Sequence, residues 1–168
     1  DYIIPNMGYL KGKEKNIRGV IITHGHYDHI GGIPHLIPML GYPPIYALPL
    51  TNAIIKKRQE DFKGLRPLNI HNVTNNDKLQ LGSFAVEFFH VNHNIPDSMA
   101  VVVKTPEGVF VHTGDWKFDD HPVGELPADV KKIAHLGELG VTALLSDSTN
   151  AMMPGRQVSE TEIGLNIE

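Results

Sequence analysis

The order of the apolar runs restricts the fold of this chain more than any other sequence feature. Runs typical of strands alternate with helical patterns in the first half, and a series of β-branched and aromatic runs follows. We expect strands at 18–23, 44–48, 68–73, 79–81, 84–91, 100–105, 108–112 and 141–146, and helices at 30–41, 50–62, 128–139 and 159–168. Strand–helix–strand–helix, then a meander, then helix–strand predicts an α/β fold with mixed layers.

Local signals refine some of these elements. Pro34 is compatible with the first turn of a helix, whereas Pro38 should shorten or kink the same helix. Ser159 and Glu162 have the spacing of a capping box, which predicts that a helix begins there. The apolar run at 141–146 predicts a buried strand.

Composition narrows the classes of function. The chain has 168 residues, of which 41% are hydrophobic and 20% are charged, as in an ordinary globular domain. It has no cysteine, which excludes disulfide scaffolds, cysteine zinc fingers and cysteine nucleophiles. The formal net charge of -4 argues against a broad basic face for nucleic acid, although metals could supply positive charge to a nuclease. With no run of 18 apolar residues, no transmembrane helix is expected.

Ten histidines are many for this length, and the strongest functional signal is His-Gly-His-Tyr-Asp-His at 24–29. It follows the first expected strand directly, where the chain leaves the sheet and exposes side chains. His24 and His26 occupy alternate positions of an extended loop, so both can face one metal. Asp28 and His29 lie further round the turn and can face a second. Nitrogen and oxygen ligands suit Zn²⁺, with Mn²⁺ or Fe as alternatives.

Two metals need more ligands, which should also follow strands in order to reach the same sheet edge. His93 comes just after the run 84–91, and Asp115 comes just after 108–112. A carboxylate can bridge two cations, which suits Asp115. His90 is the rival of His93, but it lies inside a strand pattern, where a core or edge role is expected.

Four segments together resemble the ribonuclease J family, in the β-CASP branch of the metallo-β-lactamase superfamily. They are THGHYDHIGGIPHL at 23–36, NHNIPDS at 92–98, VHTGDWKFD at 111–119 and LLSDSTNA at 144–151. The first motif is shared across the superfamily, and the other three are more selective. The resemblance implies a metallo-β-lactamase αββα sandwich, incomplete at both ends.

The resemblance also implies a role for each candidate ligand. One metal would be held by His24, His26, His93 and Asp115, and the other by Asp28, His29 and the bridging Asp115. Two divalent metal ions are thus expected, with Zn²⁺ first and Mn²⁺ as the alternative. Asp28 and Asp115 would be the catalytic carboxylates.

Asp147 and His112 are expected around the ligands rather than among them. Asp147 matches the acidic motif before the β-CASP insertion and would orient a ligand histidine. His112 either supports the site or is simply buried. No substrate contact is predicted. Lys56–Arg58 could contact RNA, but a solvated helix face is the favoured interpretation, and Trp116 and Phe118 could stack a base or pack in the core. Asp119 and Asp120 are expected in a solvated loop.

Some positions depart from the family pattern. Tyr27 and Asn94 stand where acidic and serine residues are common, and Trp116 stands where Phe is usual, but none of them is a ligand. We expect 1–150 to be a partial metallo-β-lactamase domain and 151–168 to begin the connection into a β-CASP domain. The family's first strands and its last histidine ligand would then lie outside the chain.

The implied reaction is hydrolysis of RNA by 5′→3′ exonucleolytic and endonucleolytic cleavage. Two cations would lower the pKa of a bridging water, so that it attacks as hydroxide, and would neutralise phosphate oxygens. The alternatives are a hydrolase of β-lactams, thioesters or lactones, and an inactive metal-binding fragment. The expected protein is cytoplasmic, binds RNA rather than membranes, and could form a homo-oligomer through regions outside this chain.

Overall fold

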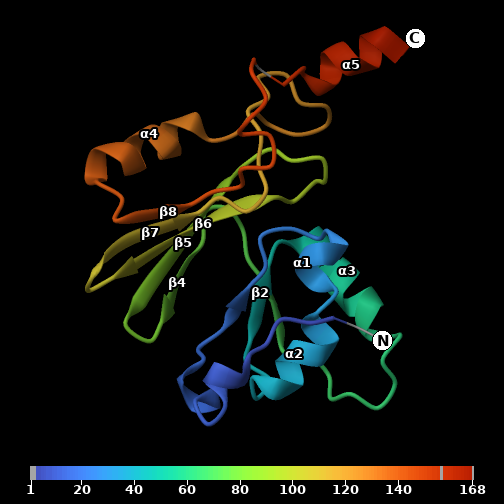
Figure 1. The fold of residues 1–168 in the computed structure, drawn as a ribbon, viewed down its shortest axis with the longest axis vertical. Helices are drawn as coiled ribbons and strands as arrows, with labels where there is room; N and C mark the ends of the chain where they lie inside the picture. The colour runs from blue at the N-terminus through green and yellow to red at the C-terminus, as the bar shows by residue number, and fades with distance from the viewer. Residues whose placement is uncertain (1–2, 156, 168) are drawn as a thin grey trace. The chain divides into compact units, whose positions relative to one another are not determined.

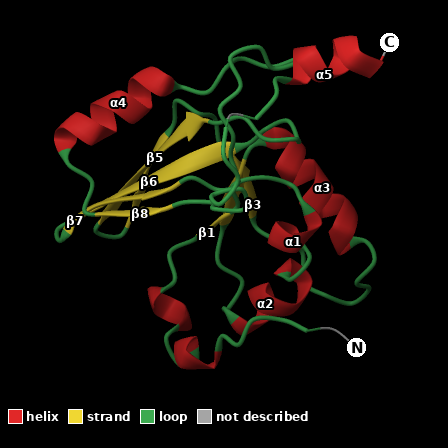
Figure 2. Ribbon diagram, turned by 45° about the horizontal axis from the view of Figure 1, so that its top comes forward, coloured by secondary structure: helices red, strands yellow, loops and turns green. Residues whose placement is uncertain are grey.

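The computed structural model describes residues 3–155 and 157–167. The described chain is an α/β fold with two sheets, and it divides into two compact units between Thr74 and Asn75 (Figure 1, Figure 2). The α/β class predicted from the order of apolar runs is therefore confirmed. Within the described ranges, no helix has the length and apolar character needed to cross a bilayer.

The first unit contains a three-stranded parallel sheet in the order β1-β2-β3. The strands are β1 (Val20–Ile21), β2 (Ile45–Ala47) and β3 (Ile70–Asn72). Parallel neighbours need crossover connections, which the helices supply. Helices α1 (Tyr27–Ile30) and α2 (Ile33–Met39) join β1 to β2, and α3 (Pro49–Gln59) joins β2 to β3. Two 3₁₀ helices, Gly8–Leu10 and Glu14–Asn16, precede β1.

Isoleucines from both helices and strands form the core of this unit. The buried cluster consists of Ile22, Ile30, Ile33, Ile37, Ile45, Ala47 and Ile55. Ile30 of α1 belongs to this cluster, so α1 is anchored in the core next to the end of β1. Burial of such side chains is the main favourable contribution to folding.

The helix predicted at 30–41 forms as the shorter helix α2, and a separate short helix that was not predicted precedes it. α2 has Pro34 in its first turn, as predicted, and it ends at Met39, just after Pro38. Residues Tyr27–Ile30 form the separate helix α1, where an extended loop was predicted. Two successive glycines, at 31 and 32, separate α1 from α2, and glycine is a poor helix former.

The second unit contains a five-stranded sheet in the order β4-β5-β6-β7-β8. The strands are β4 (Lys78–Leu81), β5 (Phe84–His90), β6 (Met99–Thr105), β7 (Gly108–His112) and β8 (Ala143–Leu145). Strands β4 to β7 form an antiparallel meander, whereas β8 pairs parallel with β7. Helix α4 (Val130–Leu139) provides the connection that this parallel pair requires, and α5 (Glu160–Ile167) follows β8.

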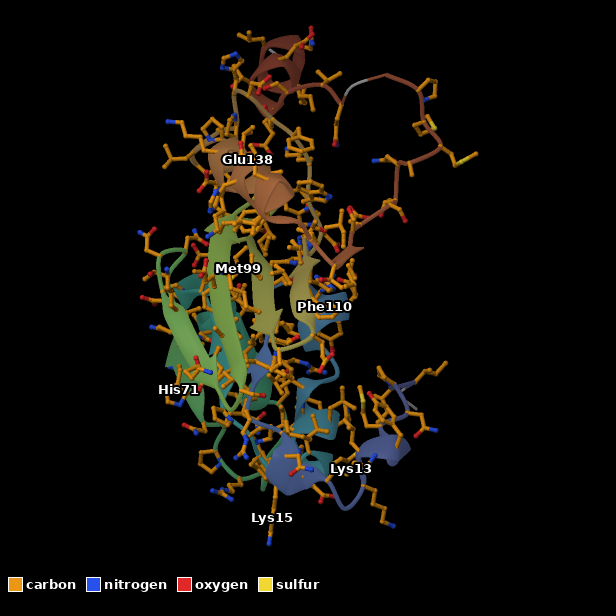
Figure 3. All side chains as sticks on the ribbon, turned by 90° about the vertical axis from the view of Figure 1, so that its left-hand side faces the viewer. Lys13, Lys15, His71, Met99, Phe110 and Glu138 are labelled. Atoms are coloured by element: carbon orange, nitrogen blue, oxygen red, sulfur yellow. The ribbon has the colours of Figure 1, made fainter. Side chains whose placement is uncertain are left out.

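Helix α4 covers one face of this sheet. Its Leu136 is buried with Phe89, Val91, Ala100, Val102 and Val111. The strands β5 and β6 carry Phe89, Ala100 and Val102 of this cluster. Met99 of β6, labelled in Figure 3, is also fully buried. Nearly continuous apolar runs in β5 and β6 are the consequence of burial on both faces.

The strand predicted at 141–146 forms as β8, but the prediction that it is buried is wrong. Leu144 and Leu145 are 60% and 51% exposed. β8 is the outermost strand of the described sheet, so it has a hydrogen-bonded neighbour on one side. An apolar run indicates a strand but does not distinguish an edge strand from a central one.

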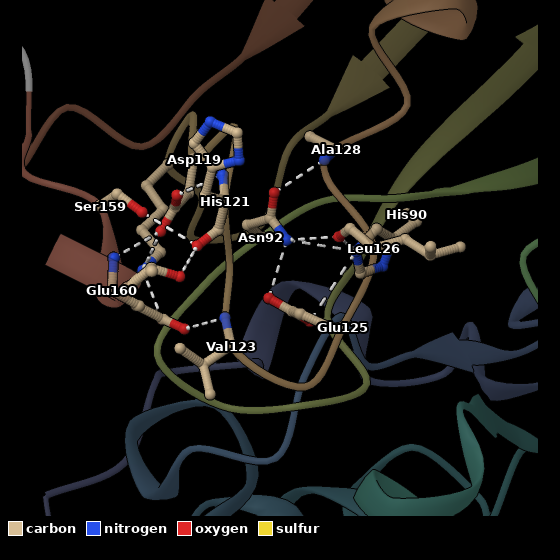
Figure 4. Close-up of polar contacts among 12 residues, drawn as sticks. His90, Asn92, Asp119, His121, Val123, Glu125, Leu126, Ala128, Ser159 and Glu160 are labelled. Atoms are coloured by element: carbon tan, nitrogen blue, oxygen red, sulfur yellow. Dashed lines mark hydrogen bonds and ion pairs between the residues drawn. The ribbon is translucent and has the colours of Figure 1, made fainter. Parts of the chain in front are cut away.

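The capping box predicted for α5 is also wrong. The Ser159 hydroxyl donates to the His121 carbonyl at 2.9 Å, so it does not cap the helix. Asp119 Oδ2 instead accepts the Glu160 N–H at 3.0 Å, across a separation of 41 residues (Figure 4). Asp119 is buried, which contradicts the predicted solvated loop, whereas Asp120 is exposed as predicted.

Candidate metal centre

His24 and His26 bring two imidazole nitrogens together just after β1. His24 is fully buried, and its Nε2 lies 3.1 Å from His26 Nδ1. The other nitrogen of His24, Nδ1, lies 3.1 Å from the Thr23 hydroxyl. If His24 carries its proton on Nδ1 and donates it to Thr23, Nε2 presents a lone pair toward His26. A hydrogen bond from the second ring nitrogen commonly fixes the orientation of a metal-binding histidine in this way.

Asp28 and His29 belong to α1 and not to an extended loop. His26 is the residue before this helix, and its carbonyl oxygen accepts the N–H groups of His29 and Ile30 at 3.0 and 3.1 Å. The helical turn brings the His29 ring back to His24, with 4.1 Å between ring centroids. Asp28 Oδ2 lies 3.4 Å from His29 Nε2. Three imidazoles and one exposed carboxylate therefore gather within six residues, and we call them the first ligand group.

His93 and Asp115 form the second ligand group, which joins the loops after β5 and β7. His93 Nε2 lies 3.8 Å from Asp115 Oδ2. The two loops are tied by their backbones, because the Asn92 carbonyl accepts the Lys117 N–H at 2.9 Å. Asn92 and Lys117 thus form an isolated antiparallel bridge beside both candidate ligands.

Asp147 and His112 make hydrogen bonds close to the second ligand group. Asp147 Oδ1 accepts hydrogen bonds from the Thr149 hydroxyl at 2.7 Å and the Thr149 N–H at 2.9 Å. These hydrogen bonds are the main cause that lowers the pKa of the Asp147 carboxyl, and the nearby charge of His93 is a smaller cause. His112 is exposed, and its Nδ1 accepts the Gly114 N–H at 2.9 Å, so it supports the turn that leads to Asp115.

His90, the rival of His93, makes a different set of contacts. Its Nε2 lies 2.8 Å from the Leu126 carbonyl oxygen, to which it can only donate, and 3.8 Å from Glu125 Oε2. A nitrogen that donates to a carbonyl cannot bind a cation at the same time. These contacts support the choice of His93, which stays a prediction.

In each group, one pair of donor atoms is close enough to share a cation. Zinc binds imidazole nitrogen and carboxylate oxygen at about 2.0–2.2 Å, so two such atoms on one ion lie at most about 4.4 Å apart. The distances of 3.1 Å for His24–His26 and 3.8 Å for His93–Asp115 both satisfy this limit. Imidazoles with carboxylates are also the donors of catalytic zinc sites, so these residues fit a metal.

A solvated helix face was the favoured expectation for Lys56–Arg58, but the Arg58 side chain is only 15% exposed and packs from α3 against Tyr27, beside the first ligand group. Its guanidinium carbon lies 5.0 Å from the centroid of the Tyr27 ring and 4.6 Å from that of Phe62, and it also donates to Asp61. Tyr27 stands between the candidate ligands of α1, and its ring leaves no room for a side chain at Gly31. Phe62 lies four residues after Arg58, but Tyr27 lies 31 residues before it, so no sequence signal indicated the contact with Tyr27.

The sequence of this chain is similar to a family model and to curated proteins of known name. The family model described as "Beta-lactamase superfamily domain" matches residues 6–159. Ribonuclease J 1 of Streptococcus pyogenes serotype M3 is 42% identical over 167 residues, which cover 99% of this chain and 30% of that protein. Ribonuclease J of Thermus thermophilus is 39% identical over 175 residues, which cover 100% of this chain and 30% of that protein. The chain therefore spans about 30% of the length of these curated relatives.

A solved structure shows the same fold at lower identity. The subclass B3 metallo-β-lactamase MEM-A1, isolated from a soil metagenome library, aligns with a TM-score of 0.57 and 19% identity. The alignment covers 83% of this chain and 62% of MEM-A1. At this identity the likeness concerns the fold alone.

Proposed function

The chain belongs to the beta-lactamase superfamily, and from this premise we propose that it forms the metal-binding part of an enzyme that hydrolyses RNA phosphodiester bonds. The observation that carries the proposal is the likeness to proteins named ribonuclease J, which extends over nearly the whole chain at 42% and 39% identity. The two ligand groups support it, because their donor atoms lie at distances that suit a shared cation.

The two ligand groups are proposed to hold two divalent cations together. The first ion would have His24, His26, His93 and Asp115 as ligands, and the second would have Asp28, His29 and Asp115. Zn²⁺ is proposed, with Mn²⁺ as the alternative. When bound, the cations would supply an activated water and neutralise charge on the scissile phosphate.

The protein's own residues would orient the reactants. Asp28 is exposed, so its carboxylate can accept a hydrogen bond from the attacking water and hold it in line with the phosphorus. Thr23 would fix the ring of the buried His24, and His112 would hold the turn before Asp115. Asp147, whose carboxyl lies near enough to His93 for the charge of that histidine to lower its pKa, would orient His93.

RNA is the proposed substrate, with 5′→3′ exonucleolytic and endonucleolytic cleavage. A formal net charge of -4 provides little attraction for an RNA backbone. The cations would therefore be the main local positive charge facing the phosphates. A cytoplasmic location is proposed with this substrate.

The proposal can be tested by measuring metal content and RNA cleavage on the same preparations. Wild-type protein, Asp115→Ala and Asp120→Ala would be analysed for bound zinc and manganese, then assayed on RNA with a 5′-monophosphate or a 5′-triphosphate. Asp120 is an exposed aspartate of the same loop and serves as the matched control. We expect Asp115→Ala to lower metal content and to reduce cleavage at least 100-fold, and Asp120→Ala to preserve both.

Two results would contradict the proposal. One is unchanged metal content and cleavage in Asp115→Ala. The other is a turnover of β-lactam, thioester or lactone substrates that exceeds the turnover of RNA by the wild-type protein.

A further inference from the structure

We propose that Asn92 is a positioning residue for the metal centre, which holds His93 and Asp115 at their mutual distance. The inference rests on the proposed function, because it assumes that these two residues bind a cation. Its evidence is separate and comes from the hydrogen bonds of a single buried amide.

Every polar group of the Asn92 side chain has a partner in the segment 125–128. The amide nitrogen donates to the Leu126 carbonyl and to Glu125 Oε1, both at 2.8 Å, and the amide oxygen accepts the Ala128 N–H at 2.7 Å (Figure 4). Asn92 is fully buried, so no water competes for these bonds. An amide has two protons to donate, and both are used here.

These partners allow one orientation of the amide. His90 Nε2 also lies 3.3 Å from the Asn92 nitrogen, but it is occupied with the Leu126 carbonyl at 2.8 Å. Turning the amide over would place its oxygen against two acceptors, the Leu126 carbonyl and the Glu125 carboxylate. Because the reversed orientation is unfavourable, the side chain holds the backbone at 92 in one position.

The backbone of Asn92 passes this constraint to both loops that carry the second ligand group. His93 is the next residue in the chain. The Asn92 carbonyl accepts the N–H of Lys117, two residues beyond Asp115. Asn92 therefore connects the two candidate ligands with the segment 125–128, which leads into α4. Leu136 of α4 is buried in the core of the sheet.

Asn52 provides a matched comparison in the first unit. It is also buried, and its amide nitrogen lies 2.8–2.9 Å from three acceptors, the Ala47 carbonyl, the His71 carbonyl and Asn72 Oδ1, which share its two protons. It ties α3 to β2 and β3, and its hydrogen-bond partners include none of the proposed ligands. A loss of stability alone should affect the two asparagines alike, whereas a loss of metal geometry should follow from Asn92 only.

The test compares Asn92→Asp with Asn52→Asp in the 168-residue chain. Aspartate keeps the shape of asparagine but replaces donors by acceptors, which at position 92 would face the Glu125 carboxylate. Zinc affinity would be measured by competition with a chelator, and the thermal unfolding midpoint would be measured without metal. We expect both variants to lower the midpoint, Asn92→Asp to weaken zinc binding at least 10-fold, and Asn52→Asp to change it less than twofold.

Glu125→Ala is a milder second variant, which removes one acceptor of the Asn92 amide from a surface loop. Glu125→Ala should weaken zinc binding about threefold or more. If Asn92→Asp does not fold, the zinc affinity of Glu125→Ala tests the inference in its place. The inference is overturned if Asn92→Asp binds zinc as tightly as wild type, or if Asn52→Asp weakens zinc binding equally. If Asn92→Asp does not fold, the inference is overturned when Glu125→Ala leaves zinc binding unchanged. A wild-type chain that binds no zinc would instead reject the proposed metal centre itself.

Discussion

Lys132 donates from α4 to Glu87 of β5, with 2.6 Å between Nζ and Oε2. Lys104 of β6 donates to the other carboxylate oxygen, also at 2.6 Å. Glu87 is buried, although it belongs to a strand with a mainly apolar face toward the helix. An ion-pair cluster thus lies within the contact between α4 and the sheet, where a lone carboxylate would be strongly unfavourable.

Acid should weaken the second unit through Glu87. Hydrogen bonds from Lys104 and Lys132 lower the pKa of Glu87 from 4.5 to about 2. Because the pKa is lower in the folded state, the stabilisation is complete above about pH 4.5 and is lost as the pH falls toward 2. We expect Glu87→Gln to reduce the free energy of unfolding by about 1–3 kcal/mol at pH 7 and by less at pH 3. Urea unfolding at both pH values measures this; a constant difference would contradict it.

Asp119→Ala should release the start of α5. The Asp119 carboxylate accepts the Glu160 N–H, which is the main reason why its pKa falls to about 2. Loss of an N-terminal cap costs about 1 kcal/mol of helix stability. We expect faster hydrogen exchange across Glu160–Ile167 in Asp119→Ala, with wild-type rates in Asp120→Ala. Equal exchange in all three proteins would show that the cap is unimportant.

Two glycine substitutions should change stability in opposite directions. Gly108 has φ +143°, and an added Cβ would lie 2.0 Å from Thr142 Oγ1. Gly137 lies in α4 with open space around the position of a Cβ. We expect Gly108→Ala to lower the free energy of unfolding by about 1–3 kcal/mol and Gly137→Ala to raise it by about 0.5–1 kcal/mol. Thermal unfolding of the two variants checks both signs.

Replacing Arg58 should loosen α1. Arg58→Met keeps most of the aliphatic stem but loses the cation–π contacts with Tyr27 and Phe62. Such contacts are worth about 0.5–2 kcal/mol. We expect a loss of this size in urea unfolding, and faster hydrogen exchange of α1. The exposed Lys56 is the control, since Lys56→Met should leave both measurements unchanged.

Hydrophobic periodicity predicted the existence and order of the main elements, because the apolar side chains that a strand or helix buries recur at fixed spacing within a short stretch of sequence. The α/β class and the eight strands found in residues 3–155 and 157–167 follow from it. The same local pattern could not show that β8 is an edge strand with exposed Leu144 and Leu145. It also missed the short helix α1, since four residues are too few for a periodic signal.

The candidate site divides in the same way. Residue type and spacing single out the candidate ligands His24, His26, Asp28 and His29, and the position just after an expected strand singles out His93 and Asp115. Arg58, Asn92 and Asp119 could not be singled out in this way, because each acts through partners far along the chain. Their residue types are common on surfaces, and only folding reveals that they are engaged.

The edge position of β8 has a consequence for handling the protein in solution. A strand with open backbone groups and exposed leucines at 144 and 145 is a template for strand pairing between molecules. Natural edges are often guarded by lysine, proline or a bulge, but the residues of β8 are alanine and two leucines. Aggregation of this chain at high concentration should therefore start at β8, and Leu144→Lys is the substitution with which to improve its solubility.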